Sequence, residues 1–329
     1  MLSGKKILIT GGTGSLGQAL TKRLLDLDVD TVRIFSRNEN KQFKMQSKLK
    51  DDRLRYFVGD VRDLPRLTRA LEDIDVVFHA AALKHVPIIE YNPFEAIKTN
   101  VLGSQNVIDA CLHENVETAV CIGTDKAVSP FNTYGATKLL MEKLFVTADN
   151  YLNKERHKTK FIAVRYGNVF GSSGSVVLHF MNQIQNNQEL SITDPAMTRF
   201  NITMNAALDF ILESTILGQG SEIFVPKLKA YKISDLVDVM AELKENVEQK
   251  IIGIRNGEKL HESLISNNEL RNTWELGNKY VIINNEKYEE NLKNKHADLK
   301  KAELTTEYSS DNAEKLSKSE LKELIHNYI

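Results

Sequence analysis

Short apolar runs alternate with amphipathic stretches through the first half of the chain. The runs predict buried strands, and the stretches, in which apolar residues recur at helical spacing, predict helices. Apolar strands that alternate with helices form a parallel sheet covered on both faces, which is the doubly wound α/β (Rossmann) fold class. Strands are expected at residues 6–10, 31–35, 54–58, 76–79, 118–123 and 161–165, and helices at 18–27, 64–71, 93–114 and 134–151, with Asn92 as N-cap of the third helix.

The pattern loosens after about residue 167, where turn-rich segments such as 171–175 and 193–195 appear. A smaller mixed domain is expected here, closing over the carboxyl edge of the sheet. The last stretch, from about Glu286, is dense in Lys and Glu and has few large apolar residues. It predicts solvated helices or a partly ordered tail.

The first expected strand runs directly into a glycine-rich turn at residues 11–17. The turn contains the GxGxxG pattern and opens a periodic helix, which is the context in which the pattern holds a dinucleotide. Glycine lets the backbone approach a pyrophosphate, and the helix N-terminus offers free N–H groups. The residues expected at the pyrophosphate are Gly11, Thr13, Gly14, Ser15, Leu16 and Gly17.

The end of the second expected strand indicates NADP rather than NAD. An acidic residue at this point would bond the ribose 2′-hydroxyl, whereas an arginine accommodates a 2′-phosphate. The sequence places Ser36, Arg37 and Lys41 there. Asp60 and Val61 follow the third strand, and Asp60 is expected either to face the adenine edge or to stabilise a turn.

These signals divide the chain into two expected domains. Residues 1–166 are expected to form a dinucleotide-binding domain, and a later part of the chain, at about 200–225, is expected to contribute further segments to it. Residues 167–329 form most of a substrate-binding domain and the C-terminal tail.

Composition excludes several classes of protein. The 329 residues carry 43 Lys plus Arg and 44 Asp plus Glu, a net charge of −1, which gives no support to a nucleic-acid partner. No apolar run approaches the roughly 20 residues of a membrane span, and the N-terminus lacks a secretory leader. Cys111 and Cys121 have no metal-ligand spacing. We expect a cytoplasmic protein with reduced thiols, no metal and no membrane contact.

Tyr134 and Lys138 form a YxxxK pattern on the helix expected at 134–151. Residues at i and i+4 share one helix face, so the phenol and the ammonium are expected to be neighbours. A nearby ammonium favours the phenolate and lowers the pKa of the phenol. Such a tyrosine can take a hydroxyl proton while a hydride leaves the same carbon.

With the glycine turn, this pattern makes the sequence similar to the extended short-chain dehydrogenase/reductase family. Thr124 stands where that family keeps an active-site Ser or Thr, and Asn100 where it keeps a helix asparagine, a position that packing or backbone bonding would also explain. Within the family the chain resembles the inverting UDP-N-acetylglucosamine 4,6-dehydratases, which begin pseudaminic acid synthesis. The segments that carry the resemblance are Asp125-Lys126 and residues 80–87, 165–169, 197–200, 254–262 and 308–310.

The resemblance implies an acid and a base beside Thr124. Tyr134, activated by Lys138, would take the proton of the sugar 4-hydroxyl while C4 gives hydride to bound NADP. Lys126 would then remove the C5 proton, with burial keeping part of it neutral, and protonated Asp125 would assist departure of the C6 hydroxyl. This division of labour comes from the resemblance and not from spacing.

The resemblance also implies the remaining contacts. Lys84 and Asn168 are expected to hold the sugar or diphosphate, Arg199 and Arg255 the diphosphate, and Glu258 the uridine ribose. The cofactor is further expected to meet Ala80, Lys84, Val169, Tyr134 and Lys138. His85 is not expected to be catalytic, and Ser173 stands where some inverting relatives have Arg.

Several alternatives stay open from sequence. A UDP-sugar 4-epimerase would use Tyr134 and Lys138 but needs no C5 base. A capsule-type dehydratase/5-epimerase shares most motifs, and a non-catalytic dinucleotide-binding scaffold is the remote alternative. Tyr134 favours the inverting branch, because retaining relatives carry Met there. The partner implied is UDP-N-acetylglucosamine, and relatives form homo-oligomers through their long helices, here 93–114 and 134–151.

Overall fold

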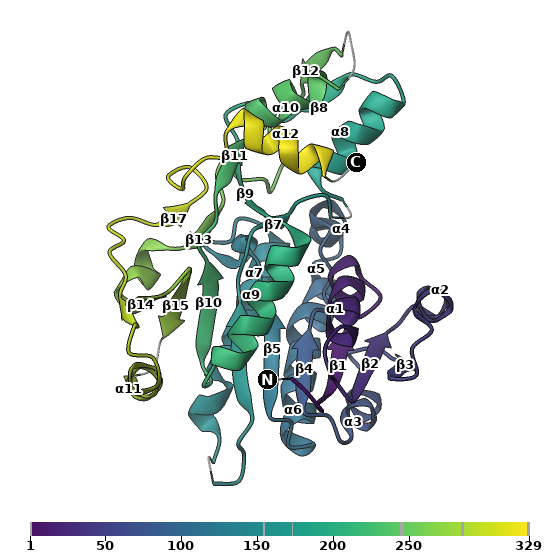
Figure 1. Cartoon of the computed structure of the whole chain (residues 1–329), viewed down its shortest axis with the longest axis vertical. Coiled ribbons are helices and arrows are strands. Elements are labelled where there is room, and N and C mark those ends of the chain that lie inside the picture. The colour runs from purple at the N-terminus through teal and green to yellow at the C-terminus, as the bar shows by residue number, and fades with distance from the viewer. Residues whose placement is uncertain (1, 154, 173, 244–246, 284–285, 328–329) are drawn as a thin grey trace.

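The computed structural model describes residues 2–153, 155–172, 174–243, 247–283 and 286–327, and a ten-stranded sheet crosses its larger lobe (Figure 1). The strand order is β16-β14-β15-β10-β6-β5-β4-β1-β2-β3. The strands from β10 to β3 are parallel, and the other three join antiparallel. Their bounds are β1 Lys6–Thr10, β2 Thr31–Ser36, β3 Leu54–Val58, β4 Val76–His79, β5 Thr118–Ile122, β6 Lys160–Val164, β10 Glu222–Pro226, β14 Thr273–Leu276, β15 Lys279–Ile283 and β16 Lys300–Lys301. The expected doubly wound fold is therefore confirmed.

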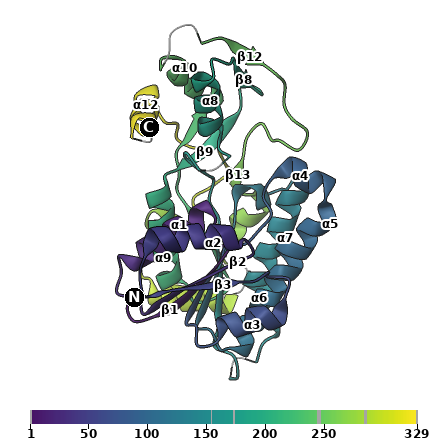
Figure 2. The ribbon, with the colours of Figure 1, turned by 90° about the vertical axis from the view of Figure 1, so that its right-hand side faces the viewer.

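Helices cover both faces of this sheet (Figure 2). One core contains Leu67, Val107 and Phe145 from three helices on one face, and a second contains Leu20, Met45 and Ile211 from three helices on the other. The first three helices are α3 Leu64–Leu71, α6 Gly103–His113 and α7 Thr133–Thr147, and the second three are α1 Ser15–Leu25, α2 Glu39–Leu49 and α9 Met204–Leu217.

The helix expected over 93–114 is present from Pro93 to His113, with Asn92 at its N-cap, but its middle is π-helical, and a separate short helix precedes it. The structure has α4 Val86–Tyr91, α5 Pro93–Ala96, a π-helix η1 Ile97–Leu102, and then α6. The helix expected over 134–151 ends as α7 at Thr147 and continues as the 3₁₀-helix η3 Ala148–Tyr151. A further 3₁₀ turn, η2 Asp125–Ala127, follows β5.

A smaller lobe lies beyond the carboxyl ends of the parallel strands (Figure 1). Its core contains Phe180, Leu236 and Leu321. Its strands are β7 Asn168–Val169, β8 Leu190–Ile192, β9 Thr198–Ile202, β11 Ala230–Lys232, β12 Gln249–Ile251, β13 Ser263–Ile265 and β17 Tyr308–Ser309, and its helices are α8 Val176–Gln185, α10 Ile233–Ala241 and α12 Lys318–His326.

The chain does not divide between the lobes at residue 166 as expected, because several later segments belong to the larger lobe. Helix α9 and β10 return to the large sheet, near the expected segment at about 200–225, and β14, β15 and β16 extend that sheet further. The helix α11 Glu286–Lys295 packs Leu292 into the second core of the larger lobe. The 3₁₀-helix η4 Asn267–Asn272 precedes β14.

The expectation of a solvated or partly ordered tail is wrong for residues 286–327. Strand β17 pairs with β13, and α12 buries Leu321 and Ile325 in the core of the smaller lobe. Leu324 packs against the same core, so three apolar residues on one face dock this short, otherwise polar helix.

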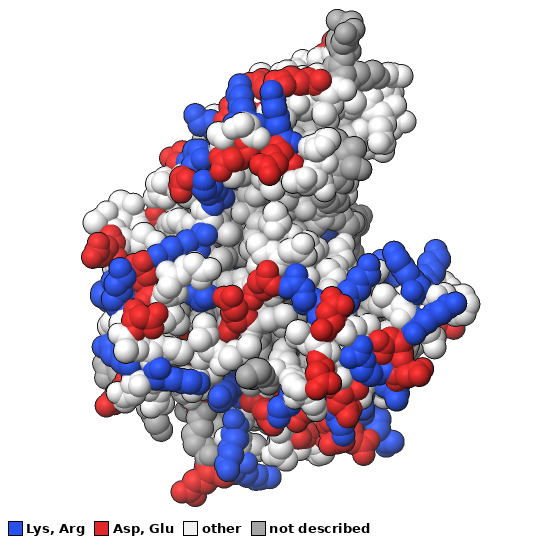
Figure 3. All heavy atoms as spheres, in the orientation of Figure 1, with Lys and Arg blue, Asp and Glu red and all other residues white. Residues whose placement is uncertain are grey.

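Charged side chains of both signs are mixed over the face shown in Figure 3, as the balanced composition suggests. Within the described residues, no helix reaches the length and apolarity that a bilayer crossing would need. In the same residues, no group of three or more His, Cys, Asp and Glu side chains is placed to hold a metal ion.

Candidate active site

The glycine turn between β1 and α1 is shaped for close backbone approach. Gly11 has a φ of +67°, and a Cβ there would lie 2.9 Å from the Ala81 Cα. A Cβ on Gly17 would lie 2.5 Å from the Gly12 Cα. Helix α1 starts after Gly14 with no capping side chain and no acidic residue in its first turn. Its N-terminus therefore keeps free N–H groups and a partial positive charge for a phosphate.

A cleft of about 600 Å³ runs from this turn along the carboxyl ends of the strands. Every residue expected to contact the dinucleotide lines this cleft: Gly11, Thr13, Gly14, Ser15, Leu16, Gly17, Ser36, Arg37, Lys41, Asp60, Val61, Ala80, Lys84, Tyr134, Lys138 and Val169. The sequence signals therefore converge on one cleft, whose shape suits an extended dinucleotide.

Basic side chains dominate the end of the cleft at β2. Arg37 is half exposed and lies 3.7 Å from Asp60, whose carboxylate also pairs with Arg62 at 2.6 Å. Burial raises the pKa of Asp60, but the hydrogen bonds and charges of these arginines outweigh it and lower that pKa overall. Asp60 is thus held as a carboxylate by arginines, and Lys41 adds a further cation to the cleft.

Asn100 fixes the loop that follows β4 against α7. Its Oδ1 accepts from the Leu83 N–H at 2.8 Å, and its Nδ2 donates to the Leu83 carbonyl at 3.1 Å and to the Thr137 Oγ1 at 3.0 Å. Thr137 in turn donates to the Tyr134 carbonyl. Asn100 lies in the π-helix, a feature often found at functional sites. It therefore positions the two walls of the cleft relative to each other.

Tyr134 and Lys138 line the cleft, but their electrostatics differ from the expectation. Burial raises the pKa of Tyr134 to about 12, opposed by the charge of Lys126 and a hydrogen bond with Thr124. The Lys138 ammonium donates to the Ile122 carbonyl at 2.6 Å, and burial lowers its pKa. The expectation of a lowered Tyr134 pKa is therefore wrong for this structure, because burial outweighs the cation that opposes it, and that cation is Lys126.

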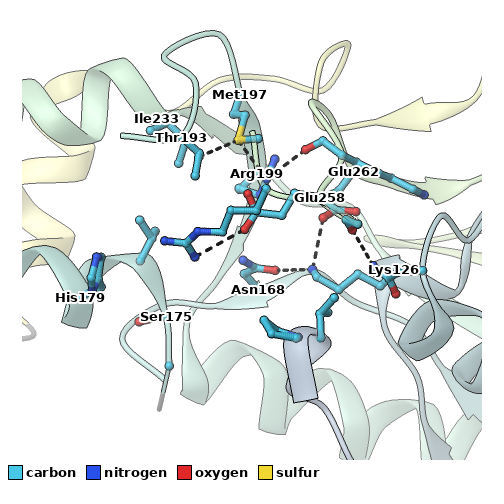
Figure 4. Close-up of a pocket in the computed structure, with 18 of the residues that line it drawn as sticks. Lys126, Asn168, Ser175, His179, Thr193, Met197, Arg199, Ile233, Glu258 and Glu262 are labelled. Carbon is cyan, nitrogen blue, oxygen red and sulfur yellow. Dashed lines mark hydrogen bonds and ion pairs between the residues drawn. The ribbon is translucent and has the colours of Figure 1, made fainter. Parts of the chain in front are cut away.

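Lys126 stands where the cleft meets a second cavity, and its ammonium has three oxygen partners. Figure 4 shows Lys126 with Asn168 and Glu262, the two partners that line this cavity. Nζ lies 3.1 Å from the Asp125 Oδ1, 3.1 Å from the Asn168 Oδ1 and 3.3 Å from the Glu262 Oε1. Burial lowers the pKa of Lys126, but the carboxylates of Asp125 and Glu262 outweigh burial and raise it overall. The expected neutral fraction is therefore absent in the resting site.

The two carboxylates differ in their surroundings. Asp125 is buried, and its Oδ1 also accepts from the Thr124 hydroxyl at 2.9 Å. Among the described residues, it lines neither cavity. Glu262 is buried as well, but it lines the second cavity, and its Oε2 has no hydrogen-bond partner in the described part of the chain.

The second cavity, of about 640 Å³, lies between the lobes and contains four of the expected substrate residues: Asn168, Arg199, Arg255 and Glu258. The Arg199 guanidinium donates to the carbonyls of Thr198 and Leu260 and, within residues 2–327 as far as they are described, has no carboxylate at ion-pair distance. Arg255 lies 3.7 Å from Glu258, whose Oε2 is buried and has no hydrogen-bond partner among the residues that the structure describes.

The remaining expected residues lie elsewhere. Lys84, which is expected to contact both the cofactor and the substrate, lines the dinucleotide cleft. His85, the N-cap residue of α4, lines the same cleft. Ser173 lies outside the described residues.

Sequence reasoning missed the residues that hold the 257–262 segment over the cavity. Lys259 donates to the Val128 carbonyl at 2.7 Å, and Asn132 donates to the Gly257 carbonyl at 2.7 Å. His179 of α8 also lines the cavity. The sequence carries no spacing signal for these contacts, because the partners are far apart in the chain.

The fold and the cleft are those of an extended short-chain dehydrogenase/reductase. Residues 7–284 match the family described as polysaccharide biosynthesis protein, and the chain belongs to that family.

Two curated relatives are similar over most of the chain. A Campylobacter jejuni protein named UDP-N-acetylglucosamine 4,6-dehydratase (inverting) is 50% identical over 284 residues, which cover 86% of this chain and 84% of the relative. A Rickettsia bellii protein named UDP-glucose 4-epimerase is 41% identical over 332 residues, covering 99% and 97%. The X-ray structure of Pen from Bacillus thuringiensis matches with a TM-score of 0.91 and 40% identity, covering 100% of this chain and 98% of that one.

Proposed function

We propose that the protein is an NADP-dependent UDP-N-acetylglucosamine 4,6-dehydratase that inverts C5, giving UDP-2-acetamido-2,6-dideoxy-β-L-arabino-hex-4-ulose. One observation carries the proposal. The Tyr134 end of the dinucleotide cleft adjoins a buried lysine–carboxylate cluster in the second cavity. A 4-epimerase has no use for such a cluster, whereas a dehydratase needs an acid and a base beside the sugar.

The first step is oxidation of the sugar at C4. When bound, the oxidised nicotinamide accepts the hydride. Tyr134 takes the proton of the 4-hydroxyl, and Thr124, hydrogen-bonded to Tyr134, orients that hydroxyl. The cation that favours the Tyr134 phenolate is Lys126, since the Lys138 ammonium is held by the Ile122 carbonyl. Lys138 remains placed to fix the ribose edge of the cofactor.

The second step is elimination of water across C5 and C6. The new 4-ketone acidifies the C5 proton, and the Lys126 cluster removes it while the C6 hydroxyl leaves. The reduced cofactor held in the cleft would supply hydride to C6. A solvent proton added to C5 from the opposite face would invert that centre, balanced by the proton that Tyr134 returns to solvent. The Asn168 amide, 3.1 Å from the Lys126 Nζ, sets the direction of the lysine side chain.

The charges of the second cavity suit a nucleoside diphosphate. Arg199 and Arg255 supply cations for the diphosphate oxygens, because a guanidinium matches that geometry. Glu258 has a buried oxygen without a partner, which can accept from a ribose hydroxyl. The sugar would then lie toward Lys126.

The cofactor preference rests on the cations at the end of β2. Arg37 and Lys41 line the cleft there, and the carboxylate beside them, Asp60, is already paired with arginines. A 2′-phosphate is therefore favoured over a free 2′-hydroxyl. We place the reaction in the cytoplasm.

A second copy of the chain is the proposed partner of an exposed apolar face on the central helices. Ile88 of α4, Phe94 of α5, Leu102 of η1 and Leu140 of α7 are 61%, 60%, 52% and 51% exposed. Side chains of this size seldom stay in water as a group. Leu140→Lys should shift a dimer to the monomer in light scattering, and an unchanged mass would contradict this interface.

The proposed function is tested by incubating the protein with UDP-N-acetylglucosamine and NADP in heavy water and following the product by proton NMR. A 4-keto-6-deoxy sugar with deuterium at C5 and the L-arabino configuration is expected. The same ketone with C5 configuration retained would refute the inversion. A C4 epimer would favour the second candidate, a UDP-sugar 4-epimerase, which the full-length similarity to the Rickettsia relative supports.

A further inference from the structure

The carboxyl groups near Lys126 are not equally placed to act on a substrate. Both contact the ammonium, but only Glu262 lines the cavity in the described structure, while Asp125 lies behind Lys126 and Thr124. An acid that protonates a leaving group must reach it directly or through one water. Position alone therefore favours Glu262 over Asp125 for that step.

The backbone of Glu262 is fixed by the C-terminal tail. Its N–H donates to the Ser310 Oγ at 2.9 Å, and its carbonyl accepts from the Ser310 N–H at 2.7 Å. The Ser310 Oγ also lies 2.7 Å from the Thr198 Oγ1 of β9. Ser310 is fully buried, so the carboxylate projects from a rigid point on the cavity wall.

The two carboxylates also differ in how well their charge is stabilised. Asp125 accepts two hydrogen bonds on Oδ1, from Thr124 and Lys126, and its Oδ2, like the Oε2 of Glu262, is buried without a partner in the described residues. Glu262 contacts Lys126 through Oε1, and its Oε2 is buried without a partner in the described residues. Glu262 is therefore held by one donor in the described structure, whereas Asp125 is held by two.

We propose that Glu262 is the general acid of the elimination step and that Lys126 and Glu262 form its acid–base pair. This assignment rests on the proposed dehydratase function. Glu262 thereby takes the role of acid that the family resemblance implies for Asp125. Asp125 keeps the role of a carboxylate that positions Lys126 and Thr124.

The proton count closes over the elimination step. A proton first moves from the Lys126 ammonium to the Glu262 Oε1, which gives a neutral amine and a neutral carboxylic acid. Closure of the site over a substrate favours this transfer, because removing water penalises the separated charges. The amine then takes the C5 proton, the C5–H electron pair forms the C5–C6 double bond, and the C6–O bond breaks. Glu262 gives its proton to the leaving oxygen, so water departs and the resting ammonium–carboxylate pair returns.

The test compares full-length wild type with Glu262→Gln, Asp125→Asn and a control, Glu213→Gln. Glu213 is an exposed carboxylate of α9 that pairs with Lys279 at 3.0 Å, far from the cavity. Each protein receives UDP-N-acetylglucosamine and NADP. The absorbance of reduced nicotinamide reports the hydride step, and proton NMR reports the dehydrated product.

Glu262→Gln should still form reduced nicotinamide but lose dehydration by about 10²–10⁴-fold, the range of general acid catalysis. Asp125→Asn should lose less, and Glu213→Gln should match wild type. The proposal is overturned if Glu262→Gln dehydrates within about threefold of wild type, or if Asp125→Asn loses more than Glu262→Gln.

Two further outcomes are also decisive. If Glu262→Gln does not fold, Glu262→Asp takes its place: slowing confined to dehydration supports the proposal, and equal slowing of both steps overturns it. If wild type itself gives a C4 epimer or no product, the proposed function fails and the role of Glu262 fails with it. Dehydration by both wild type and Glu262→Gln would remove the role of Glu262 alone.

Discussion

Replacing Arg165 with methionine should lower the free energy of unfolding by about 3–5 kcal/mol, because it leaves two carboxylates without their cation. Arg165 directly follows β6 and is fully buried. It donates to Glu142 of α7 at 3.0 and 2.5 Å, to Glu269 of η4 at 3.1 and 2.9 Å, and to the Leu264 carbonyl at 2.8 Å. The guanidinium thus ties the helix that carries Tyr134 to the sheet and to the returning C-terminal segment.

The Glu269 carboxylate gives an independent estimate of this magnitude. Burial raises its pKa, but the charge and hydrogen bonds of Arg165, together with two hydrogen bonds from Ser266, outweigh burial and lower the pKa from 4.5 to about 2, so Arg165 accounts for the larger part of the shift and not for all of it. At about 1.4 kcal/mol per pH unit, this shift corresponds to roughly 3 kcal/mol. Because the folded pKa is depressed, the stabilisation is present above pH 4.5 and is lost as the pH falls toward 2.

Urea denaturation of wild type and Arg165→Met at two pH values tests this reasoning. The difference in unfolding free energy should be largest near pH 7 and should narrow at about pH 4. Arg165→Met with Glu142→Gln should recover part of the loss, since one unpaired carboxylate is removed. Arg69→Met, on the exposed side of α3, should change stability by less than about 0.5 kcal/mol. A loss below about 1 kcal/mol at pH 7, or one independent of pH, would refute the reasoning.

Three further outcomes are expected. Lys126→Ala should abolish dehydration in the NMR assay yet leave NADP binding intact by fluorescence titration. Dehydration at the wild-type rate by this variant would show that Lys126 is not the base of the elimination. Arg37→Ser should weaken NADP binding about tenfold and leave NAD binding unchanged, and equal weakening of both would argue against a 2′-phosphate contact. Burial raises the pKa of Glu222 from 4.5 to about 7, so the folded protein holds this proton more tightly than the unfolded chain does. The contribution of Glu222 to folding stability is therefore fully present below pH 4.5 and is lost as the pH rises through 7. Melting temperatures at pH 5 and 8 should therefore differ less in Glu222→Gln than in wild type, and an equal difference would exclude Glu222 as the cause.

The elements of the large sheet could be predicted because their signals are local. An apolar run such as residues 6–10 and the glycine turn after it need no distant partner to be recognised. The π-helical segment inside the helix expected over 93–114 could not be predicted in this way. Asn100 bonds the Leu83 backbone and Thr137, and these contacts exist only once the loop after β4 and helix α7 are in place.

The cleft was predictable to the level of single residues for a topological reason. Parallel strands end at one edge of the sheet, so residues that follow β1, β2, β3 and β5 must meet there. The same rule brings Thr124 and Lys126 to the point where the cleft meets the second cavity. It says nothing about segments outside the sheet, and Glu262 reaches Lys126 from such a segment.

Protonation in the site depends on those unpredicted contacts. Lys126 is an ammonium because two carboxylates surround it, and one of them, Glu262, is held by Ser310 from the tail. Burial raises the pKa of Tyr134, and the cation that opposes burial is Lys126, which the helical spacing of Tyr134 and Lys138 did not indicate. Residue spacing can thus identify the groups that surround a substrate. Which group gives a proton and which takes one depends on how deeply each group is buried and on how many hydrogen-bond and ion-pair partners it has.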